Sequence, residues 1–174
     1  MLFGNKPIME RMYAPWRIAY IEQPQKPKEH STGCVFCDAA ASTADVANLI
    51  VHRGASAFVI LNKFPYNNGH LMVVPYLHTA SLSDLDDAAT LELLTLAKAA
   101  QSALAEAMHP EGYNLGMNLG KSSGAGIADH LHLHVVPRWN GDTNFMPVLT
   151  DVKVMPDSLE HTCLLLRDAW EDNK

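Results

Sequence analysis

Three histidines alternate with two leucines in the segment His130-Leu131-His132-Leu133-His134. Because successive side chains of a β-strand point to opposite faces of a sheet, this run predicts three imidazoles on one face and an apolar row on the other. At a rise of roughly 3.3 Å per residue, neighbouring histidines stand about 6–7 Å apart, close enough to share one anionic substrate group or one metal ion. We therefore interpret the segment as half core and half functional site.

A glycine-rich loop, Gly120-Lys121-Ser122-Ser123-Gly124-Ala125-Gly126, comes shortly before the histidines. Glycines let backbone N–H groups approach a phosphate closely. Such turns are common between strands and usually serve backbone geometry alone, so the loop by itself is weak evidence. Its position next to the histidines favours a phosphate-binding role.

Cys34 and Cys37 form a CxxC pair. Two thiolates at this spacing suit either a metal site or redox chemistry, and the spacing favours neither. A metal ion would need two further ligands, for which His78 and His130 are the candidates. Cys163 has no nearby partner in the sequence, and we interpret it as a buried helix residue.

Composition restricts the possibilities further. With 174 residues and 48% hydrophobic content, the chain fits an N-terminal arm (1–33) followed by one globular domain (34–174). Its net charge of −6 argues against general affinity for nucleic acid but allows a pocket for a free nucleotide. We find neither a membrane-spanning stretch nor a signal peptide, and three cysteines suit a reducing compartment, so we expect a cytoplasmic protein without membrane partners.

Hydrophobic patterns predict the elements that position these residues. Apolar runs predict strands over four segments: Ala57–Leu61, Leu71–Val74, Tyr113–Leu119 and His130–Val136. The first two suggest an antiparallel hairpin with a wide loop. Helical periodicity predicts a long helix over Asp84–Met108, with a capping box of Ser83 and Asp86, and a shorter C-terminal helix from Leu159 to Trp170. We expect an α+β fold, with an antiparallel sheet of about five strands against one long and one shorter helix.

The alternating histidines followed by Val135-Val136-Pro137-Arg138, together with residues 66–75, resemble the histidine-triad (HIT) superfamily of nucleotide hydrolases and transferases. Asn118-Leu119-Gly120 and residues 138–145 are most similar to the bacterial branch that splits diadenosine tetraphosphate by phosphorolysis. His134 stands where the galactose-uridylyl and fungal phosphorylase branches carry Gln, so their transfer chemistry does not carry over directly. The resemblance implies a HIT-like sheet and a homodimer or higher homo-oligomer.

The resemblance also implies roles for the histidines, with His130 as the first member of the triad. His132 becomes the nucleophile and forms a nucleotidyl-histidine, which phosphate or water then resolves. His134 helps the leaving group depart, and His70 holds the ring of His132 in its productive tautomer. The enzyme itself requires no catalytic metal.

Substrate contacts are implied in the same way. The amide of Asn118 and backbone N–H groups near Gly124 and Gly126 supply donors to the phosphate oxygens. Asn62 matches the position that binds ribose hydroxyls, although its spacing suits a turn-capping residue equally well. For the cysteine pair, the resemblance implies a structural zinc held by Cys34, Cys37, His78 and His130, which ties the N-terminal segment to the catalytic strand.

The favoured function is therefore a nucleotidyl hydrolase or transferase acting on dinucleoside polyphosphates, with diadenosine tetraphosphate as the first candidate. A hydrolase of nucleoside phosphoramidates or other AMP conjugates remains an alternative, as does a nucleotide-binding protein with little turnover. A catalytic metal centre on the H-x-H strand, as in β-barrel oxygenases, is a further one. The glycine-rich loop and Asn118 favour a nucleotide over this metal centre.

Overall fold

A computed structural model of the chain describes residues 33–144 and 154–172, so residues 1–32 of the expected N-terminal arm lie outside the described residues. Five strands form one antiparallel sheet in the order β1-β2-β3-β5-β4. The strands are β1 (Ile50–Arg53), β2 (Ala57–Leu61), β3 (Leu71–Pro75), β4 (Gly112–Met117) and β5 (Leu133–Arg138). The helices are α2 (Val35–Ala41), α3 (Asp87–Met108) and α5 (Leu159–Asp172), with single 3₁₀ turns η1 (Leu82–Asp84) and η2 (Lys121–Ser123). The expected α+β fold is confirmed.

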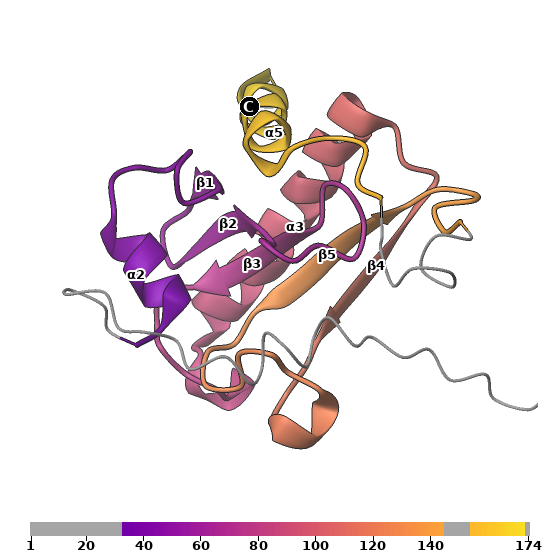
Figure 1. The fold of residues 1–174 in the computed structure, drawn as a ribbon. Helices are drawn as coiled ribbons and strands as arrows, with labels where there is room; N and C mark the ends of the chain where they lie inside the picture. The colour runs from indigo at the N-terminus through magenta and orange to yellow at the C-terminus, as the bar shows by residue number, and fades with distance from the viewer. Residues whose placement is uncertain (1–32, 145–153, 173–174) are drawn as a thin grey trace, which may run out of the picture.

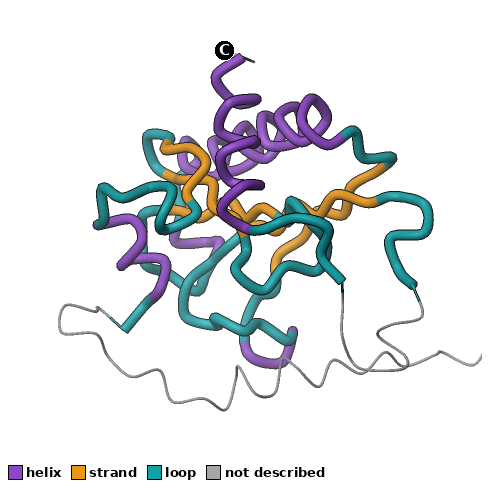
Figure 2. The backbone as a smooth tube through the Cα atoms, turned by 45° about the horizontal axis from the view of Figure 1, so that its top comes forward, coloured by secondary structure: helices purple, strands orange, loops and turns teal. Residues whose placement is uncertain are grey.

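Helices α3 and α5 cover one face of the sheet, and α2 lies with the long loops on the other (Figures 1 and 2). Val59, Val73 and Val135 pack on the helix side against Leu104 of α3 and Leu166 of α5. A second core on the opposite face joins strand residues to α2, through Phe36, Phe58, Ile60, Met72 and Val74. Because both faces of β2 and β3 are buried, their sequences are continuously apolar instead of alternating.

Strands β2 and β3 form the expected hairpin, in register from Ala57↔Pro75 to Leu61↔Leu71. The loop between them passes under the end of α3, where Gly69 has φ +75°. A Cβ added at Gly69 would lie 2.7 Å from Met108 Sδ and 3.0 Å from Leu104 Cδ2. Glycine is therefore required both by the left-handed backbone and by the close approach of the helix.

The start of the long helix differs from the expectation. Asp86 is the N-cap, and its side chain accepts a hydrogen bond from the N–H of Ala89 at 2.7 Å. Ser83, expected as the cap, lies in turn η1, where its hydroxyl contacts that of Ser81 at 2.7 Å. The predicted capping box was wrong because a carboxylate closer to the first helical turn satisfies a free N–H there.

The last strand also begins later than expected, at Leu133 instead of His130. The β3–β5 register pairs Val73 with Leu133, so its continuation would set Leu131 against Pro75. Proline has no N–H to donate to a ladder, and the N–H of Leu131 bonds the carbonyl of Thr79 instead, at 2.6 Å.

Three other elements differ from the expectation. Strand β4 spans Gly112–Met117 instead of Tyr113–Leu119. Strand β1, Ile50–Arg53, was not among the predicted segments because only four residues form it and two of them are polar. Helix α2, which contains Cys37, was not predicted either. Within the described part of the chain, no helix is both long enough and apolar enough to cross a membrane.

Candidate active site and metal site

The alternation predicted for the histidine segment is present in the structure. Leu131, Leu133 and Val135 belong to the core beneath the helices. His132 and His134 lie on the opposite face, with ring centroids 4.8 Å apart and ring planes at 83°. The segment therefore anchors itself with one side and presents two adjoining imidazoles with the other.

The ring of His132 is held by the backbone of its own segment. Its Nδ1 donates to the carbonyl of His130 at 2.8 Å, so Nε2 carries the lone pair of the neutral ring. Burial lowers the pKa of His132, although the bond to the His130 carbonyl opposes this shift. A neutral imidazole with an available Nε2 lone pair has the form that a nucleophile requires.

His70 and His134 form a directed pair. The backbone N–H of Tyr66 donates to His70 Nδ1 at 3.1 Å, so His70 carries its proton on Nε2. That nitrogen lies 3.0 Å from His134 Nδ1 and donates to it, which leaves the proton of His134 on its own Nε2. The expectation that His70 holds the ring of His132 was therefore wrong: His70 contacts His134, and the His130 carbonyl holds His132.

Tyr66 was not recognised as part of the site from the sequence. Its ring lies over the pair, with its centroid 4.7 Å from that of His70 and 5.9 Å from that of His134. A tyrosine in a turn-rich segment shows no periodicity that would indicate this position. The sequence signal that could have indicated this position is the spacing of four residues before His70, because a turn of that length folds Tyr66 back onto the histidine.

Asn62, at the end of β2, lies beside the same pair. Its side-chain oxygen accepts from the N–H of Phe64 at 2.9 Å, and its amide nitrogen is 3.4 Å from His70 Nδ1. Asn62 thus caps the turn and borders the histidines at once.

The other expected substrate contacts follow β4. The β4–β5 register pairs Gly116 with His134, and its continuation sets half-buried Asn118 opposite His132. Gly124 and Gly126 lie farther along the exposed loop that leads from β4 to the histidines. Gly124 has φ +83°, a conformation that favours glycine.

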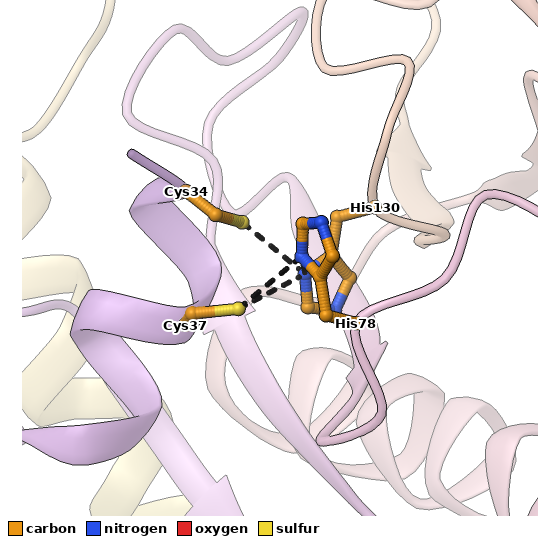
Figure 3. Close-up of side chains that lie close together, drawn as sticks. All are labelled: Cys34, Cys37, His78 and His130. Carbon is orange, nitrogen blue, oxygen red and sulfur yellow. Dashed lines mark hydrogen bonds between the residues drawn. The ribbon is translucent and has the colours of Figure 1, made fainter. Parts of the chain in front are cut away.

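Cys34, Cys37, His78 and His130 converge on one point, with one ligand atom of each within 4.8 Å of all the others (Figure 3). His130 Nδ1 lies 3.2 Å from Cys34 Sγ, 3.6 Å from Cys37 Sγ and 3.2 Å from His78 Nδ1. Cys37 Sγ is also 3.3 Å from His78 Nδ1. These four residues could hold a metal ion.

The donor set fits zinc. Tetrahedral bonds of about 2.0–2.1 Å to nitrogen and about 2.3 Å to sulfur separate neighbouring donor atoms by roughly 3.3–3.8 Å, close to the distances observed. His130 Nε2 donates to the carbonyl of Pro75 at 2.9 Å, so the lone pair of Nδ1 faces the thiols. Burial lowers the pKa of His130, and His78 and His132 lower it further, whereas the bond to Pro75 opposes the shift.

The three histidines of the motif thus divide between two sites. The side chain of His130 belongs to the candidate metal site, so the three imidazoles do not share one ligand. Phe36, inside the CxxC pair, packs against both His130 and His132, with ring centroids 5.3 and 5.2 Å away. The two sites therefore share a buried wall, which the sequence did not indicate.

A model of the HIT domain family matches residues 43–141. The chain is 38% identical over 170 residues, covering 96% of this chain and 87% of the relative, to AP-4-A phosphorylase of Mycobacterium tuberculosis. It is 29% identical over 107 residues, 62% of this chain and 75% of the relative, to adenosine 5'-monophosphoramidase of Schizosaccharomyces pombe. The crystal structure of a Zn-bound histidine triad family protein from Mycobacterium smegmatis aligns with a TM-score of 0.62 at 28% identity, covering 80% of this chain and 94% of that chain.

Proposed function

This chain belongs to the HIT domain family, and we propose that it is an enzyme that cleaves dinucleoside polyphosphates, with diadenosine tetraphosphate as substrate and inorganic phosphate as acceptor. The observation that carries the proposal is the state of His132: a buried, neutral ring whose Nδ1 proton is engaged and whose Nε2 is nucleophilic. The 38% identity with AP-4-A phosphorylase over nearly the whole chain supports the choice of substrate.

The proposed reaction has two steps. His132 Nε2 attacks the α-phosphorus of one adenylate, a P–N bond forms, and the P–O bond to the leaving ATP breaks. An oxygen of inorganic phosphate then attacks the same phosphorus, the P–N bond breaks, and ADP is released. Water in place of phosphate would yield AMP.

His134 stands beside the nucleophile with its proton on Nε2, so it can donate to an oxygen of the reacting phosphate or leaving group. The bond from His70 fixes that tautomer. In the proposed site, the Asn118 amide and backbone N–H groups near Gly124 and Gly126 stabilise phosphate oxygens, and Asn62 binds ribose hydroxyls.

We also propose a bound zinc ion, with Cys34, Cys37, His78 and His130 as its ligands. All four ligand positions are filled by protein, so the ion would stabilise the fold and leave no coordination position for substrate. It joins α2 to the segment that holds His132. Thiolate ligands require reduced cysteines, which supports a cytoplasmic location.

A homodimer is also part of the proposal. β4 is an edge strand of the sheet and leaves Leu115 45% exposed, and Leu119 just beyond it is 47% exposed. Helix α3 leaves Leu91 66% and Leu94 58% exposed. Pairing through this edge and helix would cover apolar surface, and light scattering coupled to size-exclusion chromatography measures the resulting mass.

Product analysis tests the function directly. Diadenosine tetraphosphate is incubated with the protein, with and without inorganic phosphate, and the nucleotides are separated by chromatography. ADP and ATP formed only with phosphate would support phosphorolysis. AMP and ATP formed without it would establish a hydrolase, and no products in either sample would contradict the proposed substrate.

A phosphoramidase is the second candidate, because the relatives also include an adenosine 5'-monophosphoramidase. The same nucleotidyl-histidine would form, with an amine as the leaving group and water as the acceptor. Incubation with adenosine 5'-monophosphoramidate separates the two candidates: faster release of AMP from this compound than cleavage of diadenosine tetraphosphate favours the phosphoramidase.

A further inference from the structure

We propose that Asp142 is a positioning residue for the histidine pair: through Asn67 it holds the β2–β3 loop, and the loop keeps the Tyr66 N–H on His70. The proposal rests on the proposed function for its consequence in catalysis, but the hydrogen-bond direction that it explains can be measured without substrate. Asp142 lies one residue beyond the part of the chain that matches the HIT domain.

Asp142 is bound by the last residue of β5. Arg138 donates to it twice, from Nε to Oδ2 at 2.6 Å and from Nη2 to Oδ1 at 3.1 Å. The third guanidinium nitrogen donates to Asn114 Oδ1 of β4 at 2.7 Å. A carboxylate bound by a planar two-point fork, itself tied to the neighbouring strand, has a defined direction as well as a charge.

Asn67 transmits that position to the loop. It is 6% exposed, and its amide nitrogen donates both to Asp142 Oδ2 at 2.7 Å and to the carbonyl of Pro137 in β5 at 3.0 Å. Pro137 lies three residues after His134 on the same strand. One buried amide thus joins the loop before His70 to the strand that carries its partner.

The loop in turn supplies the shorter of the two contacts that keep the proton off His70 Nδ1, the other being the Asn62 amide nitrogen at 3.4 Å. Tyr66, one residue before Asn67, donates its N–H to His70 Nδ1 at 3.1 Å, and the carbonyl of Asn67 accepts from the backbone N–H of His70 at 3.2 Å. If Asn67 loses its bond to Asp142, it is held less firmly, and the Tyr66 N–H loses its fixed direction. His70 can then place its proton on Nδ1, which reverses the bond to His134 and removes the proton from His134 Nε2.

The neighbouring asparagine has its own anchor. Asn68 Oδ1 accepts from the hydroxyl of Thr162 in α5 at 3.3 Å. Loss of Asp142 therefore removes one of the bonds that hold Asn67, while its bond to the Pro137 carbonyl remains and the next residue stays attached to the C-terminal helix. We expect a local change of hydrogen bonding and not an unfolded loop.

Histidine side-chain nitrogen NMR on the full-length protein tests the proposal. Asp142→Ala and Asn67→Ala should each change the ¹⁵N shifts of His70 toward a mixture of tautomers. Asp142→Asn keeps an acceptor for Asn67 and should restore much of the native pattern. Asp45→Ala is the matched control, because Asp45 also pairs with an arginine, Arg53, at 2.9 Å.

Kinetics with diadenosine tetraphosphate and phosphate supply the second readout. We expect kcat to fall about 10- to 100-fold in Asp142→Ala and Asn67→Ala with little change in KM, and the double variant to be no worse than the poorer single one. Unchanged His70 shifts in both variants, or equal effects in Asp45→Ala, would overturn the proposal. If the variants alter the His70 shifts but the wild-type protein does not cleave this substrate, the result would support the positioning role of Asp142 and contradict the proposed substrate.

Discussion

His132 donates its Nδ1 proton to the backbone carbonyl of His130, whose own Nδ1 faces the thiols of Cys34 and Cys37. One residue therefore provides a candidate metal ligand with its side chain and orients the proposed nucleophile with its main chain. We therefore expect that a change in the position of His130 would also change the position of His132.

Replacement of the proposed nucleophile should abolish turnover. We expect His132→Ala to lower kcat for diadenosine tetraphosphate by at least about 10³-fold, because the first step then has no nucleophile to form the covalent intermediate. Nucleotide binding should persist within a few-fold, measured by calorimetry with a non-cleavable analogue. Substantial turnover by the pure variant would exclude His132 as nucleophile.

Replacement of a thiol in the metal site should remove the metal. We expect Cys37→Ser to reduce bound zinc from about one ion per chain to near zero and to lower the unfolding temperature, because zinc binding is coupled to folding. Metal content is measured by mass spectrometry on protein purified without added metal. Cys163→Ala is the control, because Cys163 is also a free thiol on a helix but lies outside the cluster. Wild-type protein without zinc, or loss of zinc in the control alone, would contradict the site.

Gly69→Ala should destabilise the fold. The added Cβ would meet Met108 Sδ at 2.7 Å in a backbone with φ +75°, and we expect a loss of about 1–3 kcal/mol in the free energy of unfolding. Urea denaturation measures the difference. Gly112→Ala is the control, since a Cβ there meets no atom within 4 Å, and Met108→Ala in the Gly69→Ala background should recover the steric part. Equal stability of the two alanine variants would refute the close approach.

Stability in acid should depend on Asp142. Hydrogen bonds from Arg138, and to a smaller extent Asn67, hold the pKa of this carboxyl well below its usual range, although burial opposes them. Because the folded-state pKa is lowered, the stabilisation is fully present above the unfolded value of about 3.9, declines as the pH falls below that value, and is lost once the pH has fallen through the folded-state pKa. Urea denaturation at pH 6, 4 and 3 should therefore show a smaller loss in Asp142→Asn than in the wild type. Parallel curves would show that Asp142 does not contribute to acid unfolding.

Much of the fold followed from local patterns. The apolar runs of β2 and β3, the long period of α3 and the alternation around His132 each reflect which side of an element is buried, and burial depends on the residues of that element. The start of α3 at Asp87 and of β5 at Leu133 could not be read in this way. The start of α3 depends on which of several polar residues reaches a free N–H. The start of β5 depends on a proline in another strand.

The sequence by itself determined which residue types were available for chemistry: an H-x-H-x-H run, a CxxC pair and a histidine before the second predicted strand. Tertiary structure decided how they are used. His130 joins the cysteines, His70 donates to His134, and Asp142 reaches Asn67, 75 positions earlier in the chain. Hydrogen-bond direction and metal geometry depend on the spatial approach of distant segments, and local spacing carries no measure of that approach.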